Sequence, residues 1–205
     1  MRKDIYMFTE CSSPTVRIYG WDKDCITYGY SQDMSKEIDL KKADELGIEC
    51  AKRPTGGGLA LHSKDDLAYC VVSPSEYMPK GIKGAYLYIS TILLDALKEL
   101  GVDAEIIGHR SKIKDTHADL CFSSSLDHEI TINGRKLVGS AQKRSREKVI
   151  QQGAISVSDI PENMYSVLLK KDALAGLREN SVRLSQIFND QRLFDKLKDS
   201  RRMRN

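Results

Sequence analysis

Hydrophobic and polar residues alternate over much of the N-terminal half of the chain, a pattern that is typical of β-strands. Residues 15–30, TVRIYGWDKDCITYGY, contain two β-rich runs separated by Asp-Lys-Asp, which predicts two strands joined by a turn. Residues 35–47 instead place apolar side chains at helical spacing and end on Gly47, a favourable helix C-cap. Further strands are predicted around the glycine-rich stretch that follows, over residues 48–55, 59–63 and 66–73.

The strongest helical pattern covers residues 84–100 and stops at Gly101. Apolar side chains recur there at helical steps and form one stripe: Ile82, Ala85, Tyr86, Ile89, Ile92, Leu93, Ala96, Leu97 and Leu100. Such a stripe predicts a helix packed on the core of the domain. A short strand is expected over 103–108. The polar segment 109–127 is a candidate functional loop, because compact domains seldom carry long irregular connections without a use.

The clearest local signal is the Asn133-Gly134 pair between two alternating runs, which predicts a two-residue hairpin turn with positive φ at both positions. The opposing pairs in that hairpin would be Ile132 with Arg135, Thr131 with Lys136, and Ile130 with Leu137. The apolar members then share the face that packs on the core. Lys136 is expected on the other, open face of the sheet.

A further strand is predicted over 148–158, short helices over 161–200, and a solvated basic end after them. Strands therefore lie on both sides of one long helix and are joined by hairpins. This order predicts an α+β fold with a mixed, largely antiparallel sheet and packed helices. We expect a single domain over residues 1–205, because that length fits one substantial core.

Composition narrows the class of protein. With 40% hydrophobic residues, 30% charged residues and a formal net charge of +3, the chain matches an ordinary globular domain and gives no case for a nucleic-acid partner. No run of about 18 apolar residues is present, so we expect no membrane span. The N-terminus has no apolar run of signal-peptide length either, so we expect no signal peptide. The five cysteines include no C-x-x-C pair, which predicts reduced thiols in the cytoplasm and no metal site.

Three consecutive glycines interrupt the predicted strands within RPTGGGLALH, residues 53–62. Glycine weakens a strand, so a bulge or a sharp turn is the simplest explanation. The functional alternative is that a ligand lies directly against the backbone and its N–H groups at Gly56, Gly57 and Gly58. Arg53 is a candidate partner for a carboxylate or phosphate. His62 is either an acid or base or a hydrogen-bonded structural residue.

Cys121 is the candidate nucleophile. It lies in the polar segment just before the hairpin that carries Lys136. A thiol needs a nearby cation or base to become a thiolate at neutral pH, and Lys136 supplies one if the segment folds back over the sheet. The alternative for a cysteine is a small buried hydrophobe, and we apply it to Cys25, Cys50 and Cys70.

Three ordered motifs together resemble the lipoate and biotin protein ligase superfamily. They are RPTGGGLALH at 53–62, GRKLVGSAQKR at 134–144 and QQGAI at 151–155, and the resemblance covers most of residues 15–190. The chain is most similar to the lipoyl branch, which holds the lipoate-protein ligases and the cysteine-dependent octanoyltransferases. The Cys121-Phe122 dipeptide ahead of the Gly-Arg-Lys motif favours the octanoyltransferases. The resemblance implies a fold like that of class II aminoacyl-tRNA and biotin synthetases.

The resemblance also implies roles for individual residues. The glycine motif would line an acyl tunnel, and the lysine of the Gly-Arg-Lys motif would contact the acyl carbonyl or an acyl-adenylate. The residues so assigned are catalytic Cys121 and Lys136, and substrate-binding Arg53, Gly56, Gly57, Gly58, His62, Gly139, Ser140 and Ala141.

Two departures from the family pattern stand out. Only fourteen residues precede Thr15, so we expect the family's usual N-terminal helix to be missing, and one wall of the acyl site to be either missing or supplied by another chain. Gln152 stands where a histidine is usual, and an amide cannot shuttle protons. We also expect no C-terminal accessory domain of the kind common in ligases.

These observations lead to three hypotheses. The first is an acyltransferase that moves an octanoyl or lipoyl group from acyl carrier protein, through a Cys121 thioester, to a lysine of a lipoyl domain or glycine cleavage H protein, without a cofactor. The second is a lipoate-protein ligase that uses ATP and Mg²⁺ and forms an acyl-adenylate. The third is a non-catalytic subunit that binds an acyl group or a lipoyl domain, which the departures at the N-terminus and at Gln152 suggest.

Overall fold

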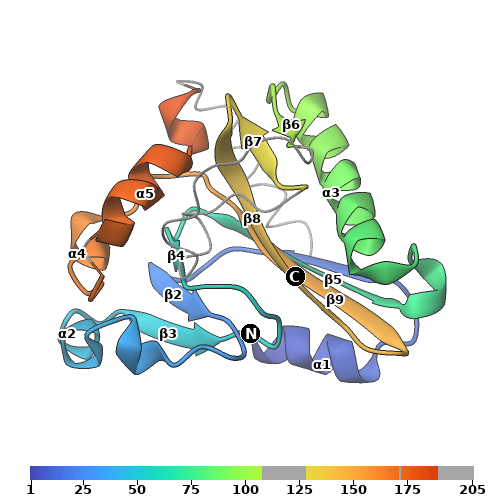
Figure 1. Cartoon of the computed structure of the whole chain (residues 1–205), viewed down its shortest axis with the longest axis horizontal. Helices are drawn as coiled ribbons and strands as arrows, with labels where there is room; N and C mark the ends of the chain where they lie inside the picture. The colour runs from blue at the N-terminus through green and yellow to red at the C-terminus, as the bar shows by residue number, and fades with distance from the viewer. Residues whose placement is uncertain (108–127, 171, 189–205) are drawn as a thin grey trace.

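The computed structural model describes residues 1–107, 128–170 and 172–188, which form two sheets surrounded by helices (Figure 1). The larger sheet has six strands in the order β1-β5-β9-β8-β7-β6, and its neighbouring strands are antiparallel. Their bounds are β1 Thr15–Tyr19, β5 Leu67–Pro74, β9 Lys148–Ile155, β8 Arg135–Arg144, β7 Ile130–Ile132 and β6 Glu105–Ile106.

The smaller sheet has three strands in the order β3-β2-β4. Their bounds are β3 Glu49–Lys52, β2 Cys25–Tyr28 and β4 Ala60–His62. Strand β2 runs parallel to β3 and antiparallel to β4. The expected α+β fold with a mixed, largely antiparallel sheet is therefore confirmed.

The helices cover both faces of the larger sheet. Figure 1 shows α3 along one side, α1 below the sheet, and α4 with α5 on the side opposite α3. The α-helices span α1 Arg2–Glu10, α2 Leu40–Glu45, α3 Gly81–Glu99, α4 Glu162–Tyr165 and α5 Asp172–Asn180, and short 3-10 turns span Met34–Lys36, Ser75–Tyr77 and Leu184–Gln186. Among the residues described, no helix has both the length and the apolar character needed to cross a membrane.

Helix α3 confirms the long helix predicted from the apolar stripe. Ile89 and Leu97 on its inner face are buried against the larger sheet. Ile82 and Ile92 belong to the same stripe but are 62% and 53% exposed, so the prediction of the buried face is wrong there. Ile82 lies in the first turn of α3, and Ile92 lies at one edge of the stripe.

The hairpin at Asn133-Gly134 is confirmed, with φ of 50° and 74° at the two positions. Its register differs from the expected one, because a bulge makes Ile130 pair with Val138 rather than with Leu137. Leu137 and Val138 both join the core under α3. The extra residue reverses the alternation along β8, so the face that carries Lys136 before the bulge carries Gly139 and Ala141 after it.

The first ten residues contradict the expectation of a missing N-terminal helix, because α1 occupies Arg2–Glu10. Met7 packs with Cys70, Val72 and Ile150 on the underside of the sheet. Asp4 is completely buried and receives hydrogen bonds from the sheet. Helix α1 is therefore attached to the sheet by the hydrogen bonds of Asp4 and by the small apolar contact of Met7. It has no broad apolar stripe by which the sequence pattern could have predicted it.

Two other predictions need correction, and a third lies outside the described residues. The helix expected over 35–47 is divided into a 3-10 turn and the short α2, although Gly47 ends it in the left-handed conformation as predicted, with a φ of 65°. The strand expected over 103–108 is reduced to β6. The candidate loop 109–127 falls outside the residues that the structure describes.

Candidate active site

A narrow pocket lies where the smaller sheet meets the face of β8 and β9 that is turned away from α3. It encloses about 30 Å³, about the room of one water molecule. Its lining residues come from the N-terminus, from β1 and the residues after it, and from β2, β4, β8 and β9, with one residue just after β3. They are Met1, Tyr19, Trp21, Thr27, Arg53, Ala60, His62, Gly139, Ser140, Ala141, Gln152, Gly153 and Ala154.

Five of the residues predicted from sequence meet in this pocket: Arg53, His62, Gly139, Ser140 and Ala141. They come from motifs that are far apart in the chain, and the pairing of β8 with β9 and the placing of the small sheet bring them together. Small residues of β8 and β9 form much of the wall made by the larger sheet, together with Gln152 and Tyr19. This wall leaves the backbone accessible to a ligand, as the glycine motif alone suggested for its own loop.

Arg53 holds the glycine loop. Its guanidinium donates to the carbonyl oxygens of Gly56 at 3.1 Å and Gly58 at 2.6 Å, and to Thr27 Oγ1 at 2.7 Å. The buried guanidinium thus donates three hydrogen bonds to oxygen atoms of the protein itself. The structure therefore gives Arg53 a part in fixing the loop, which differs from the expected pairing with a carboxylate or phosphate of a ligand.

The glycine loop is a tight turn that packs against the end of β2. Gly57 has a φ of 84°, which favours glycine. A Cβ atom on Gly29 would lie 2.0 Å from the carbonyl oxygen of Gly57, whereas one on Gly56 would meet nothing within 4 Å. The glycine that permits the close approach is therefore Gly29, which sequence analysis did not single out, and Gly56 faces open space.

His62 is a neutral hydrogen-bonded residue. Its Nε2 lies 2.8 Å from Thr27 Oγ1, and that hydroxyl already accepts a hydrogen bond from Arg53. The hydroxyl proton is then directed to Nε2, which leaves the imidazole proton on Nδ1. Burial, with Arg53 and Arg183 nearby, lowers the pKa of His62 to about 3. Of the two sequence-based options for His62, the hydrogen bond and the lowered pKa favour the structural one.

Two N–H groups of the pocket have no partner among the described residues. Trp21 stacks on His62 with ring centroids 4.6 Å apart, and both rings line the pocket. Trp21 Nε1 and His62 Nδ1 are buried without a hydrogen-bond acceptor in the described part of the chain. Buried N–H donors normally have a hydrogen-bond acceptor, so an acceptor atom of a ligand would be stabilised most by binding at these two atoms.

Gln152 links the glycine loop to α1. Its Oε1 accepts a hydrogen bond from Thr55 Oγ1 at 3.1 Å, and its Nε2 donates to Asp4 Oδ2 at 2.7 Å. Asp4 also accepts from Arg17 at 2.5 Å and from the Tyr19 hydroxyl at 2.8 Å. Burial and the Asp4 carboxylate raise the pKa of Tyr19, so that hydroxyl keeps its proton and its role as a donor. An amide, which both donates and accepts, fits this place between a hydroxyl and a carboxylate.

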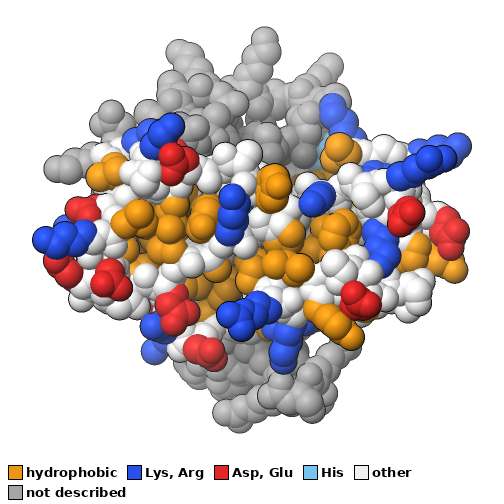
Figure 2. Space-filling model, turned by 90° about the horizontal axis from the view of Figure 1, so that it is seen from below, with side chains coloured by type: hydrophobic (Ala, Val, Ile, Leu, Met, Phe, Trp, Pro, Cys, Tyr) orange, Lys and Arg blue, Asp and Glu red, His pale blue; other side chains and the backbone are white. Residues whose placement is uncertain are grey.

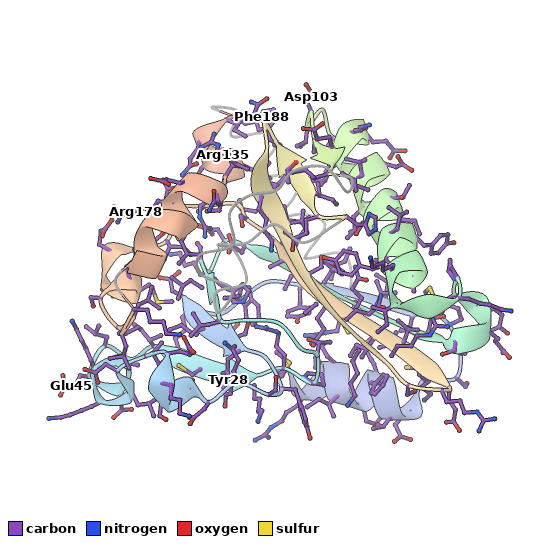
Figure 3. All side chains as sticks on the ribbon, in the orientation of Figure 1. Tyr28, Glu45, Asp103, Arg135, Arg178 and Phe188 are labelled. Atoms are coloured by element: carbon purple, nitrogen blue, oxygen red, sulfur yellow. The ribbon has the colours of Figure 1, made fainter. Side chains whose placement is uncertain are left out.

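Lys136 does not line the pocket, although it lies on the same strand. Figure 3 shows Arg135 at the hairpin end of β8, far from Tyr28 at the end of β2. Lys136 is 2% exposed, and its Nζ lies 2.5 Å from Glu129 Oε1. Lys136 lies on the face away from the core isoleucines, as expected, but that face is not open there, because the ammonium is enclosed and ion-paired. Its suggested partner Cys121 lies outside the described residues.

The remaining cysteines of the described chain have the character expected of small hydrophobes. Burial raises the pKa of Cys25 to about 12 and raises the pKa values of Cys50 and Cys70. These groups stay protonated near neutral pH, and a protonated thiol is a poor nucleophile. In the described ranges, no group of His, Cys, Asp and Glu side chains could hold a metal ion.

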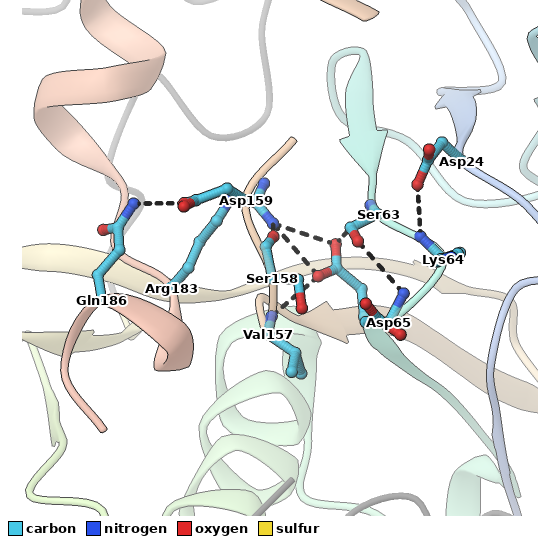
Figure 4. Close-up of polar contacts among 10 residues, drawn as sticks. Asp24, Ser63, Lys64, Asp65, Val157, Ser158, Asp159, Arg183 and Gln186 are labelled. Atoms are coloured by element: carbon cyan, nitrogen blue, oxygen red, sulfur yellow. Dashed lines mark hydrogen bonds and ion pairs between the residues drawn. The ribbon is translucent and has the colours of Figure 1, made fainter. Parts of the chain in front are cut away.

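Asp66 joins the β4–β5 turn to the segment after β9 (Figure 4). Its Oδ1 accepts from the backbone N–H of Val157 at 2.8 Å, and its Oδ2 accepts from that of Ser63 at 3.1 Å. Arg183 contacts the same carboxylate at 3.2 Å and donates to the carbonyl oxygen of Ser158 at 2.6 Å. Burial outweighs these partners and raises the pKa of Asp66 to about 6.

Several residues of this site carry no signal in the sequence pattern. Asp4, Thr27 and Thr55 are ordinary polar residues there, and only their long-range partners identify them. Trp21 is the single tryptophan of the chain, which was a usable signal for a buried or binding position.

Comparisons with proteins of known structure support the fold. The chain superposes on a lipoate-protein ligase A bound with ATP with a TM-score of 0.74 and 22% identity, over 95% of this chain and 74% of that one. It superposes on a bi-partite lipoate protein ligase from Thermoplasma acidophilum with a TM-score of 0.73 and 20% identity, over 96% and 74%. The fold class expected from the resemblance is confirmed.

Sequence comparisons reach closer relatives. The chain is 36% identical over 163 residues to octanoyltransferase LipM of Macrococcus caseolyticus, covering 76% of this chain and 59% of that protein. It is 39% identical over 158 residues to octanoyltransferase LipM of Moorella thermoacetica, covering 76% and 58%. The matches thus span less than two thirds of these relatives. The model of the lipoyl protein ligase A/B catalytic domain matches residues 2–200, so the chain belongs to that family, as its motifs indicated.

Proposed function

We propose that this chain is a lipoyl-pathway acyltransferase that moves an octanoyl group through a cysteine thioester to a lysine of a lipoyl domain or glycine cleavage H protein. The observation that carries the proposal is the similarity, at 36–39% identity, to proteins named octanoyltransferase. The pocket supports it, because four of the six residues that line it from β8 and β9 are glycines or alanines, which leave room for an unbranched acyl chain.

The reaction consists of two acyl transfers. The Cys121 thiolate attacks the carbonyl carbon of the octanoyl thioester on acyl carrier protein, the C–S bond to the carrier breaks, and the carrier thiol takes a proton. The lysine amine of the acceptor then attacks the new thioester, the bond to Cys121 breaks, and an amide forms with release of one proton. The reaction needs no oxidant and no nucleotide.

The described residues support this chemistry by binding and positioning. Arg53 and Gln152 fix the glycine loop beside the pocket. His62 is neutral, so it serves as a hydrogen-bond donor through Nδ1 and does not carry protons between groups. Lys136, oriented by Glu129, is the cation that we assign to lowering the pKa of the Cys121 thiol and stabilising the oxyanion.

The volume of the pocket implies that side chains move when substrate binds. About 30 Å³ is less than an eight-carbon chain requires. Met1 lines the pocket, and its unbranched thioether side chain is the most adaptable of the lining groups. Its movement would open the pocket toward α1, at low cost compared with a shift of the glycine wall.

The first experiment is incubation with octanoyl-acyl carrier protein, followed by intact-mass analysis. We expect a hydroxylamine-sensitive octanoyl adduct on the wild-type chain and none on Cys121→Ser. Cys50→Ser is the matched control, since Cys50 lies outside the pocket and its pKa is raised by burial. An adduct that persists in Cys121→Ser, or the absence of any adduct on the wild type, would contradict the proposed mechanism.

An ATP-dependent lipoate ligase is the alternative, and the shared fold with the ATP-bound lipoate-protein ligase A is the observation that favours it. In that case ATP, Mg²⁺ and lipoate would be required, and modification of a lipoyl domain would survive Cys121→Ser. A non-catalytic subunit would bind the acyl group without turnover. One argument for that third reading is removed, because α1 is present and Met1 contributes to the wall of the pocket.

A further inference from the structure

Two lysines and two aromatic rings gather on the underside of the molecule, next to the glycine loop. Lys143 of β8 lies over the rings of Phe8 and Tyr30, with Nζ 5.7 Å and 5.4 Å from their centroids. Lys52 of β3 lies over Tyr30 at 5.2 Å. We call these four residues the basic-aromatic patch. They come from α1, β3, β8 and the residues after β2.

The patch exposes both charge and a large apolar ring. Tyr30 is 64% exposed, and both lysines are exposed. In the described part of the chain, neither ammonium forms an ion pair with a carboxylate, whereas Lys23 and Arg17 do. Figure 2 shows hydrophobic side chains on the underside, with lysines and arginines as well as acidic side chains among them. Exposed aromatic rings beside cations are typical of protein-binding surfaces.

The patch borders the pocket. Lys52 directly precedes Arg53, and Lys143 follows Ala141 on the same face of β8, about 7 Å further along the strand. The backbone N–H of Tyr30 donates to the carbonyl oxygen of Thr55 at 2.9 Å, which ties the ring to the glycine loop. A protein bound on the patch would therefore sit at the rim of the pocket.

We propose that the basic-aromatic patch docks the acidic surface of the acyl donor, a carrier protein that presents an acyl chain as a thioester. Uncompensated lysines attract a negatively charged partner, and Tyr30 supplies the apolar contact at the centre. The donor fits this location better than the acceptor does. A donor must pass the whole chain into the pocket, whereas an acceptor lysine needs to reach only the carbonyl end.

This inference rests on the proposed function, but its test does not require turnover. The test measures binding of fluorescently labelled octanoyl-acyl carrier protein to the wild-type chain and to Lys52→Glu, Lys143→Glu and the double variant. Charge reversal should weaken binding about tenfold for each single variant and more for the double variant. Raising salt from about 0.05 M to about 0.5 M should weaken wild-type binding and affect the double variant far less.

The matched control is Lys98→Glu, the same reversal on an exposed lysine at the far end of α3. It should bind the carrier as the wild type does. A second control uses octanoyl-pantetheine, a small thioester without a protein surface. The patch variants should form the acyl-enzyme from it at the wild-type rate, because the patch contacts the carrier and not the acyl chain.

The outcomes separate the two proposals. Unchanged carrier binding in the double variant, or equal weakening by Lys98→Glu, would overturn the docking proposal. Equal loss with octanoyl-pantetheine would also overturn it, since the lysines would then act on the pocket. If the wild type binds the carrier in a way that depends on Lys52 and Lys143 and yet forms no acyl-enzyme, that result would refute the proposed chemistry and leave the docking proposal standing. If a lipoyl domain binds instead of the carrier, and its binding depends on Lys52 and Lys143, the patch docks the acceptor and the inference is overturned.

Discussion

The two faces of β5, β9 and β8 bury their residues by different means. The face that carries the pocket buries Asp4, Arg53, His62 and Gln152, and hydrogen bonds connect these side chains to partners from other elements. The opposite face packs on α3 and borders an open apolar groove of about 430 Å³. Its lining includes Val71, Ile89 and Leu93.

The two faces differ in how far their side chains can rearrange without loss of stability. A buried polar group needs a partner at a fixed distance and direction, so the pocket face has little freedom to rearrange. Apolar contacts are not directional, so the α3 face can stay folded beside an open groove. The two faces meet at Tyr69, which packs under α3 and whose hydroxyl lies 2.6 Å from Ser140 Oγ. We infer that the stability of the pocket face depends on specific buried partners, whereas that of the α3 face depends on the apolar surface that it buries.

The largest effect is expected where a buried charge loses its partner. Glu129→Leu would leave the Lys136 ammonium without the carboxylate 2.5 Å away, and should lower the free energy of unfolding by about 3–5 kcal/mol. Chemical denaturation measures this loss. The double variant Glu129→Leu/Lys136→Met should recover most of it, and a double variant no more stable than the single one would contradict the assignment to charge burial.

The α3 face should respond through loss of packing. Ile89 is 3% exposed and lines the groove, so Ile89→Ala would enlarge it and lower the free energy of unfolding by about 2–4 kcal/mol. Ile92 lines the same groove but is 53% exposed, and Ile92→Ala should cost less than about 1 kcal/mol. Equal losses for the two variants would mean that α3 is not packed on the sheet as described.

The glycine loop tests the rigidity of the pocket face. Gly29→Ala would place a Cβ atom 2.0 Å from the carbonyl oxygen of Gly57, which forces backbone apart and should cost about 1–3 kcal/mol. Gly56→Ala meets nothing within 4 Å and should leave stability within about 0.5 kcal/mol of the wild type. Thermal and chemical unfolding of the pair decide this. Similar stabilities for Gly29→Ala and Gly56→Ala would show that the loop can move away from β2.

Local signals predicted much of the fold. The Asn133-Gly134 turn and α3 are encoded by short-range patterns, and the structure confirms both. Helix α1 was missed because it is stabilised by Asp4 and its partners on β1 and β9, and such contacts leave no periodic pattern. The bulge in β8 was missed for a related reason. One extra residue changes which face Lys136 shares with Ala141, and alternation in the sequence does not reveal it.

The site was predictable in part. The motifs identified Arg53, His62 and the Gly139–Ala141 wall, and the structure gathers them in one pocket. Their chemistry was not predictable, because it depends on burial and on partners distant in the chain. His62 is neutral since Thr27 and two arginines surround it, and no feature of the motif shows that. The nucleophile Cys121 stays a prediction from the sequence.

The smallest expected effect is a pH dependence in which two buried groups oppose each other. The pKa of His62 falls from 6.5 to about 3 on folding, so the unfolded chain takes up this proton first and stability is lost as pH falls below about 6.5. The pKa of Asp66 rises from 3.8 to about 6, so the folded chain takes up that proton first and stability is gained as pH falls through about 6.

Between pH 6.5 and 5.5 the His62 contribution is a loss of about 1 kcal/mol, and the Asp66 contribution is a gain of about 0.7 kcal/mol. For these two groups the wild type should therefore change little over that interval. His62→Asn removes the loss, so its free energy of unfolding should rise on acidification relative to the wild type, and Asp66→Asn should show the opposite slope. Denaturation at the two pH values measures both. Parallel slopes in all three proteins would mean that His62 and Asp66 keep ordinary pKa values, and that the pocket face is more hydrated than its hydrogen bonds imply.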